Sequence, residues 1–157
     1  MILIAPSQRR ELLRRTRTVA VVGASGNRLR PSYTVFSYLR RQAEFTVTPI
    51  NPSLTDIDGI TAYPSLRAYA AEHGPPDLVD VFRKPSDVAG VVEEAIAVHA
   101  PAIWFQYGVI NDAAIALADG AGMDVVVDRC LKVEHARFVG GLSMAGLNSG
   151  VITSRRP

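Results

Sequence analysis

A short apolar run followed by a glycine-containing loop places the strongest constraint on how this chain folds. Residues 18–22 read TVAVV, which is typical of a strand buried on both faces of a sheet. Gly23 follows directly and permits a sharp turn with close backbone approach, and Gly26 adds freedom to the same loop. A helical pattern begins near Ser32, so this stretch predicts a strand, a tight turn and a helix.

The rest of the chain continues this alternation of strands and helices. The pattern predicts further strands at 45–51, 60–63, 77–82, 102–106 and 124–128, and helices at 6–16, 32–42, 65–74, 85–96, 111–120 and 130–138. The expected caps are Ser7, Ser32, Ser65 and Asn111, Gly74 closes one helix, and Pro49 is expected to end the second strand.

This order predicts an α/β fold of the Rossmann-like, doubly wound kind. Its mainly parallel sheet has five to six strands, with helices on both faces. Residues 1–138 are expected to form a single domain with an N-terminal helix, and residues 139–157 a mobile C-terminal tail.

Folds of this class bind ligands at the carboxyl ends of their strands, where the strand order reverses. These ends are Gly23–Asn27, Ile50–Pro52, Phe82–Pro85, Gln106–Gly108 and Asp128–Cys130. The first loop, with a helix N-terminus after it, suits a phosphate group, although it is neither a G-K-[ST] loop nor a complete G-x-G-x-x-G. A purely structural glycine turn is the alternative.

The residues after the second and fourth strands bear on which ligand is bound. NAD-binding domains commonly carry an acidic residue at the end of the second strand, but this chain has Asn51, and Asp56 and Asp58 come later in an expected turn. Arg83 and Lys84 follow another strand and suit phosphate groups, although a structural ion pair of Arg83 with Asp80 or Asp128 is an alternative.

Charge is unevenly distributed along the chain, although the net charge is only +2. The first 45 residues contain Arg9, Arg10, Arg14, Arg15, Arg17, Arg28, Arg30, Arg40 and Arg41, against Glu11 and Glu44. Such a cluster favours an anionic partner, either nucleic acid or a phosphorylated small molecule, whereas solvated helix faces explain most of these arginines without any partner.

The composition speaks against several other classes of protein. The chain is 48% hydrophobic and 20% charged, and it has no apolar stretch long enough for a membrane helix, so we expect a cytoplasmic protein. Its one cysteine and three separated histidines predict no metal site. Cys130 and His135, five residues apart, do not share a helix face well, and the sequence points to no catalytic residue.

Five motifs in a fixed order resemble those of the stand-alone CoA-binding proteins, which are similar to the CoA-binding domain of the succinyl-CoA synthetase alpha subunit. They are VVGASGNRLRPSYTVFSYLRRQ, VTPINP, DLVDVFRKPSDV, IWFQYGVIND and VVVDRCLKVEH, and the resemblance covers residues 12–138.

This resemblance implies that coenzyme A, or an acyl-CoA, lies in the crevice of a Rossmann-like domain. The loop Gly23–Asn27 holds the diphosphate, Asn51–Ser53 lies by the adenosine part, and Phe82–Pro85 flanks the cofactor. A lysine that binds CoA in the synthetase is missing here, where Ser53 and Leu54 stand, so Arg28, Arg30 or Lys84 is expected to take the 3′-phosphate.

The strand ends and the resemblance together give the candidate cofactor-binding residues. These are Gly23, Ala24, Ser25, Gly26, Asn27, Arg28, Arg30, Ser32, Asn51, Pro52, Ser53, Phe82, Arg83, Lys84, Pro85 and Gln106.

The resemblance also suggests what the chain does with the cofactor. The synthetase needs a second domain with a phosphorylated histidine, and the present sequence ends about where that domain would begin. We therefore expect a non-catalytic carrier, sensor or regulatory module rather than an enzyme. An NAD(P)-binding oxidoreductase is the alternative, and binding of nucleic acid or a protein through the arginine-rich N-terminus ranks last. We expect neither a membrane nor nucleic acid as a partner, and the sequence names no protein partner.

Overall fold

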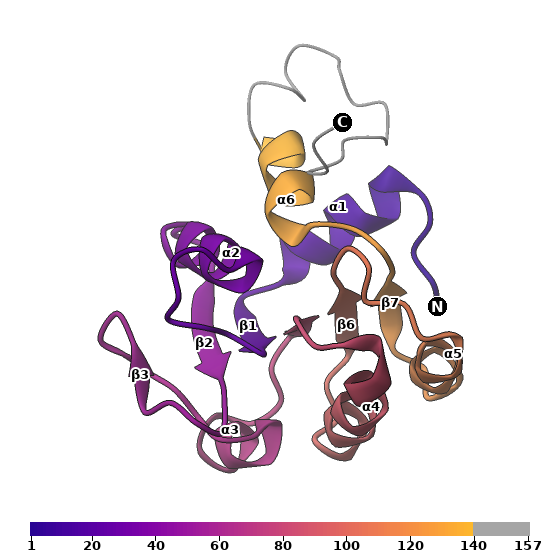
Figure 1. Ribbon diagram of the computed structural model, residues 1–157. Coiled ribbons are helices and arrows are strands. Elements are labelled where there is room, and N and C mark those ends of the chain that lie inside the picture. Colours follow the sequence, from indigo (N-terminus) through magenta and orange to yellow (C-terminus); the bar gives the residue numbers. More distant parts are fainter. Residues whose placement is uncertain (140–157) are drawn as a thin grey trace.

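A five-stranded parallel sheet forms the centre of the molecule (Figure 1), in a computed structural model that describes residues 1–139. Its strand order is β2-β1-β5-β6-β7. The strands are β1 (Thr18–Val22), β2 (Thr46–Ile50), β5 (Leu78–Val81), β6 (Ala102–Phe105) and β7 (Asp124–Val126). The doubly wound parallel sheet predicted from the sequence is therefore confirmed, with five strands in the central sheet.

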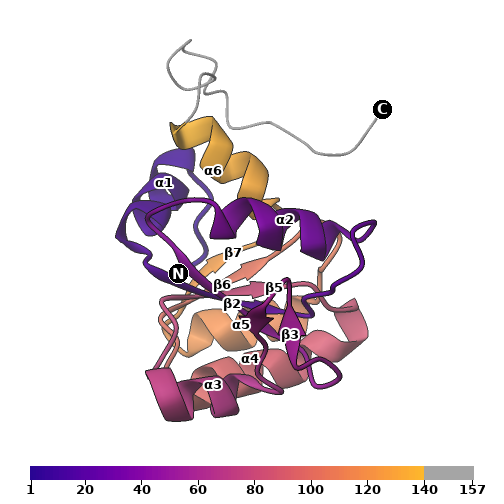
Figure 2. The ribbon, with the colours of Figure 1, turned by 90° about the vertical axis from the view of Figure 1, so that its left-hand side faces the viewer.

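Helices cover both faces of this sheet (Figure 2). One face carries α1 (Pro6–Arg15), α2 (Pro31–Arg40) and α6 (Leu131–Val139), and the other carries α3 (Leu66–His73), α4 (Val88–Ala97) and α5 (Asp112–Gly120). A short 3-10 helix, Pro85–Asp87, leads into α4. Among residues 1–139, no helix has both the length and the apolar character needed to cross a membrane.

Alternate residues of each strand belong to the two cores on either side of the sheet. In β1, Val19 and Val21 pack beneath α1, α2 and α6, whereas Ala20 and Val22 pack against the helices of the other face. Trp104 and Phe105 are both fully buried, one in each core, as expected from the apolar run of β6. Burial on both faces explains why these strands are apolar throughout.

The short strand predicted at 60–63 does not join the central sheet. Residues Ile60–Thr61 form β4, which pairs antiparallel with β3, Asp56–Ile57, as a separate two-stranded ribbon. The turn between them places Asp58 and Gly59 at positive φ, as the aspartates of an expected turn suggested.

Pro49 was expected to end β2, but it lies inside that strand and pairs with Val21. The position tolerates proline because β2 is at the edge of the sheet, where an N–H group need not join the ladder.

The helix caps were only partly predictable. Ser65 and Asn111 each accept a hydrogen bond from a first-turn backbone N–H, at 3.0 and 3.1 Å, as expected. Ser7 and Ser32 are not caps. Pro6 and Pro31 occupy the first helical positions, so each cap lies two residues earlier than expected, at Ala5 and Arg30.

The chain's first residues extend the sheet at its β7 edge, which the sequence did not indicate. The N–H of Leu3 donates to the carbonyl of Val125 at 2.8 Å, and the N–H of Val125 donates to the carbonyl of Met1 at 2.9 Å. This pairing covers a strand edge that would otherwise be open. The α6 helix continues to Val139, and the rest of the tail predicted at 139–157 lies outside the described residues.

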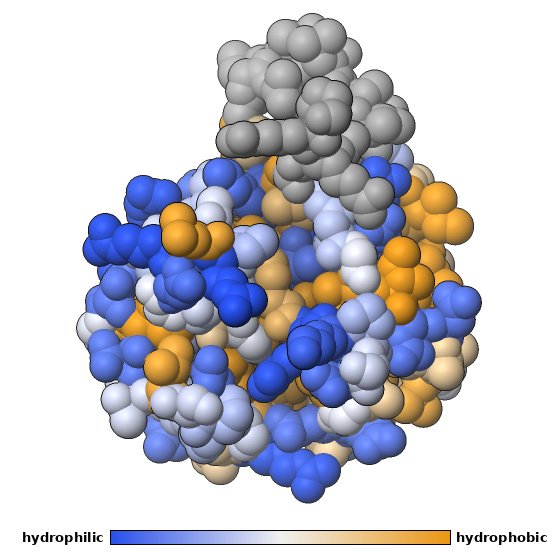
Figure 3. Space-filling model, in the orientation of Figure 1, coloured by the Kyte–Doolittle hydropathy of each residue, from blue (hydrophilic) through white to orange (hydrophobic). Residues whose placement is uncertain are grey.

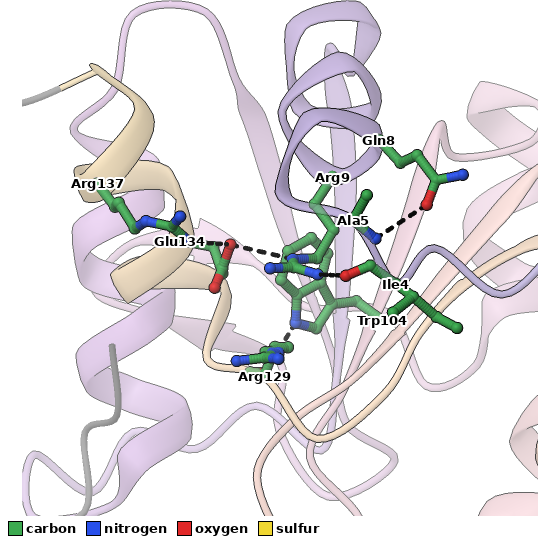
Figure 4. A network of polar contacts seen from close by, with 8 residues as sticks. All are labelled: Ile4, Ala5, Gln8, Arg9, Trp104, Arg129, Glu134 and Arg137. Carbon is green, nitrogen blue, oxygen red and sulfur yellow. Dashed lines mark hydrogen bonds and ion pairs between the residues drawn. The ribbon is translucent and has the colours of Figure 1, made fainter. Parts of the chain in front are cut away.

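A buried ion-pair network joins α1 to α6 (Figure 4). Arg9, 1% exposed, donates from Nε to Glu134 at 3.1 Å, and Arg137 approaches the same carboxylate oxygen at 3.5 Å. Arg9 also donates to the carbonyl of Ile4, and the indole of Trp104 beneath it donates to the carbonyl of Arg129 at 2.8 Å. The solvated-face interpretation is therefore wrong for Arg9, whose charge is buried and paired.

We predict that Glu134→Gln destabilises the protein by about 3–5 kcal/mol, because it leaves two buried guanidinium groups without a counter-charge. Chemical denaturation followed by circular dichroism measures the change. Glu93→Gln, on the exposed side of α4, is the matched control and is expected to stay within about 0.5 kcal/mol of the wild type. Equal stability of both variants would contradict the importance of the network.

Candidate functional site

A cavity of about 750 Å³ lies at the carboxyl ends of the strands, beside the pair β1 and β5 where the strand order reverses. Figure 3 shows this face hollowed at its centre, with hydrophobic residues at the bottom and hydrophilic side chains around them. The described residues that line it are Gly23, Ala24, Ser25, Arg30, Pro31, Ser32, Val35, Asn51, Phe82, Arg83, Lys84, Gln106, Tyr107, Gly108, Val109 and Cys130. We refer to it as the cleft.

Gly23 turns the chain at the end of β1 and lets two backbones meet. Its φ is +82°, and a β-carbon on it would lie 1.9 Å from the carbonyl oxygen of Phe82. The sharp turn and the close backbone approach expected at Gly23 are therefore confirmed. Gly26 does not share it: its φ is not positive, and an added β-carbon would meet no atom within 4 Å.

The loop after Gly23 is held by its own side chains. The Asn27 N–H donates to Ser25 Oγ at 3.0 Å, and Asn27 Oδ1 accepts from the N–H of Leu29 at 3.0 Å. Asn27 therefore shapes the loop and does not line the cleft. After this loop, the first turn of α2 lines the cleft through Pro31 and Ser32. The positive end of the α2 dipole therefore lies at the cleft.

Asn51 ties the loop after β1 to the loop after β2. Its Nδ2 donates to the carbonyl of Ala24 at 2.8 Å, and its Oδ1 accepts from the N–H of Ser53 at 2.8 Å. The side chain that stands where NAD-binding domains carry an acid is thus engaged in shaping the cleft. Asp58, further along, accepts from the Tyr33 hydroxyl at 2.6 Å and lies 3.6 Å from Arg40.

Three cationic side chains line the cleft: Arg30, Arg83 and Lys84. Within the described part of the chain, none of them forms a side-chain hydrogen bond or an ion pair, so the structure does not pair Arg83 with Asp80 or Asp128. No Asp or Glu is among the described lining residues. The cleft therefore carries uncompensated positive charge suited to an anion.

Gln106 and Asp80 form a polar pair beneath the cleft. Gln106 donates from Nε2 to Asp80 Oδ1 and accepts from the N–H of Leu131, at the start of α6, at 3.3 Å. Asp80 is fully buried, and its Oδ2 has no hydrogen-bond partner among residues 1–139. Burial raises the pKa of Asp80 from 3.8 to about 7, against the lowering effect of Gln106.

Cys130 lines the cleft but has no histidine beside it. Burial raises the pKa of its thiol, and the nearby Asp80 raises it further, so the group is held as a thiol. His135 instead lies between the Tyr38 hydroxyl, 2.8 Å from Nδ1, and Glu44, 2.6 Å from Nε2. The structure does not bring Cys130 and His135 together as a nucleophile and base.

The cleft brings together most of the residues predicted from the sequence. Those that line it are Gly23, Ala24, Ser25, Arg30, Ser32, Asn51, Phe82, Arg83, Lys84 and Gln106. Those that do not are Gly26, Asn27, Arg28, Pro52, Ser53 and Pro85. Pro52 lines a neighbouring cavity of about 310 Å³, and Arg83 lines both cavities.

Several lining residues were absent from the list of candidate cofactor-binding residues: Pro31, Val35, Tyr107, Gly108, Val109 and Cys130. Tyr107, Gly108 and Cys130 belong to the strand ends at which a ligand was expected, so their position in the cleft agrees with that expectation. Val35 lies on α2 beyond Ser32, and only the packing of that helix shows that it faces the cleft. Residues 1–139 contain no group of three or more His, Cys, Asp or Glu side chains placed to hold a metal ion.

Comparison with known families now bears on this cleft. Residues 17–136 match the model of a family described as a CoA binding domain. The chain belongs to this CoA-binding family. The match spans the cleft loops and the sheet, and it confirms the family inferred from the sequence motifs.

Relatives from several organisms are similar to most of the chain. It is 36% identical over 127 residues to an uncharacterized Bacillus subtilis protein, YneT, covering 81% of this chain and 91% of the relative. A hypothetical protein from Pyrococcus horikoshii has a TM-score of 0.81 and 35% identity, covering 87% of this chain and 93% of its own. A Thermus thermophilus structure has a TM-score of 0.78 and 34% identity, covering 85% and 98%.

We predict that Gly23→Ala destabilises the protein by more than the 1–3 kcal/mol or so of backbone strain alone, because its methyl group also meets the Phe82 carbonyl. The matched control is Gly26→Ala in the same loop, which has room for the methyl group. Thermal or chemical unfolding of the two variants provides the comparison. An unchanged stability of Gly23→Ala would show that the backbones separate without cost.

We predict that Asp80→Asn flattens the pH dependence of stability. With the pKa of Asp80 raised to about 7, the folded state keeps a proton that the unfolded state releases above about pH 4. This carboxyl therefore lowers the free energy of unfolding progressively between about pH 4 and pH 7, by an amount on the order of 4 kcal/mol.

Urea denaturation at several pH values across this window measures the difference between wild type and variant. The exposed Asp112→Asn is the control and is expected to follow the wild type at every pH. If the curves of wild type and Asp80→Asn run parallel, Asp80 does not hold a proton in the folded protein.

Proposed function

We propose that the cleft binds coenzyme A or an acyl-CoA, and that the protein is a cytoplasmic, non-catalytic carrier, sensor or regulatory module built on one domain, residues 1–138. The observation that carries this proposal is a cleft whose cations, Arg30, Arg83 and Lys84, have no partner in the described chain. Membership of the CoA-binding family supports coenzyme A as the anion.

The residues present fit this cofactor. A cavity of about 750 Å³ is within the usual range for small-molecule sites. In our proposal, the diphosphate lies over the loop that begins at Gly23, next to the positive end of the α2 dipole. Lys84 and Arg30 take the 3′-phosphate, and Arg28, which does not line the cleft, is the less favoured candidate.

The uncharged part of the lining suits the pantetheine arm. Val35, Val109 and Cys130 supply apolar or weakly polar surface in the same cleft as the cations. The raised pKa of Cys130 keeps it a thiol, and the amides of Asn51 and Gln106 are already bonded to the protein. These features favour holding a cofactor over transforming one.

The geometry favours coenzyme A over NAD(P). An NAD site needs an acceptor for the ribose hydroxyls at the end of β2, but the Asn51 side chain is engaged by Ala24 and Ser53. Neither Asp56 nor Asp58 lines the cleft, and Asp58 is bonded to Tyr33.

We predict that the purified protein binds CoA more tightly than dephospho-CoA, and both more tightly than NAD. Lys84→Gln and Arg30→Gln are each expected to weaken CoA binding by about tenfold or more, because each removes a charge-assisted hydrogen bond. Isothermal titration measures the affinities, with the exposed Arg67→Gln on α3 as the matched control. Absence of heat with every CoA species, or tighter binding of NAD than of CoA, would overturn the proposed function.

A further inference from the structure

A second, basic pocket lies at the opposite end of the sheet from the cleft. It has a volume of about 320 Å³ and is lined, among the described residues, by Arg10, Leu13, Arg14, Arg17, Glu44, His135, Phe138 and Val139. Arg17 directly precedes β1, and its carbonyl accepts from the N–H of Thr46, the first residue of β2. The pocket is therefore at the amino ends of these strands, whereas the cleft is at their carboxyl ends.

The described residues do not balance the positive charges in this pocket. Arg14 is paired with Glu11: its Nε and Nη2 donate to the two carboxylate oxygens of Glu11, at 2.8 Å each. Arg17 donates from Nη1 only to backbone carbonyls, those of Arg14 and Thr16, at 2.8 and 2.9 Å. Arg10 forms no side-chain hydrogen bond or ion pair within residues 1–139. The guanidinium groups of Arg10 and Arg17 thus form no ion pair with a carboxylate of the described residues.

The single acidic residue of the lining, Glu44, is held by a neighbour. Its Oε1 lies 2.6 Å from His135 Nε2. Partial burial acts to raise the pKa of Glu44, but backbone and His135 hydrogen bonds and the charge of Arg17 outweigh it and lower the pKa overall. The carboxylate is therefore engaged with the pocket wall, and it leaves Arg10 without compensation.

The floor of the pocket is apolar and firmly built. Leu13 and Phe138 are buried at 5% and 7% exposure. His135, 2% exposed, is fixed at both ring nitrogens, by Tyr38 and Glu44, and packs against the Phe45 ring at 5.1 Å between centroids. A rigid apolar floor under guanidinium groups is the pattern expected for a small molecule with both an anionic group and an apolar part.

Two helices connect this pocket with the cleft. The first turn of α2 lines the cleft at Pro31, and further along the same helix Tyr38 fixes His135 of the pocket wall. The α6 helix begins next to Cys130 of the cleft and ends at Val139 of the pocket. Figure 2 shows both helices on the same side of the sheet as α1.

We propose that the basic pocket is a second ligand site, distinct from the cleft, for a small organic anion that carries a phosphate or carboxylate group on an apolar body. Arg10 and Arg17 bind the anionic group, and the apolar body lies on Leu13 and Phe138. The size of the pocket, about 320 Å³, favours a small molecule over a polymer.

Phenyl phosphate is a suitable probe, followed by NMR of the 15N-labelled full-length chain. We expect saturable shifts of the backbone amides of Arg10, Arg17, Glu44 and Phe138, and weaker binding of inorganic phosphate, which lacks the apolar body. The double variant Arg83→Gln/Lys84→Gln removes two charges of the cleft, and the shifts at the pocket are expected to persist in it. This design separates the pocket from the proposed cofactor site.

Arg10→Gln and Arg17→Gln are each expected to weaken the pocket's affinity for phenyl phosphate by about tenfold. Arg67→Gln on the other face of the sheet is the matched control. Arg10 forms no side-chain hydrogen bond or ion pair within the described chain, so its variant is expected to fold normally, which circular dichroism verifies. Shifts confined to the loop at Gly23 and the start of α2, or shifts at the pocket that are equal in Arg10→Gln and wild type, would overturn the proposal.

Discussion

At Gly23, the backbone of Phe82 occupies the space that a β-carbon would need. A β-carbon on residue 23 would lie only 1.9 Å from the carbonyl oxygen of Phe82. This close approach joins the ends of β1 and β5, the two strands between which the connections turn to opposite sides. It sets the position of the loop after β1 and, through it, the first turn of α2. The loop after β2 depends on the same turn, because Asn51 is bonded to Ala24. The positions of the loops around the cleft therefore depend on the contact between Gly23 and Phe82.

Around that contact, the polar side chains divide into those used by the protein and those left for a ligand. The loops and the start of α6 are held by hydrogen bonds from three side chains, those of Asn27, Asn51 and Gln106. The cations of the cleft, Arg83 and Lys84 among them, find no partner in the described chain. The site therefore offers a ligand positive charge that is held by a rigid frame. Such a frame suits binding of a phosphorylated cofactor.

Neighbouring arginines of α1 have different roles. Arg9 is buried against Glu134 and holds α1 on α6, whereas its neighbour Arg10 points to a solvent-accessible pocket and has no carboxylate partner in the described chain. The difference follows from the helical period: one residue's rotation separates the face that packs on α6 from the face that borders the pocket. A patch of basic sequence is therefore not one functional feature.

The sequence by itself determined the architecture and the neighbourhood of the site. Apolar runs such as residues 18–22, interleaved with helical patterns, specify a parallel sheet because both faces of each strand must be covered. The need for glycine at position 23 and the cluster of Arg83 and Lys84 after a strand were also readable. What only the tertiary structure decided is which of these groups remain available, because hydrogen bonding and burial depend on contacts between segments far apart in the chain. Such contacts engage Asn51, bury Arg9 against Glu134, place Cys130 in the cleft and direct His135 to a pocket at the other end of the sheet.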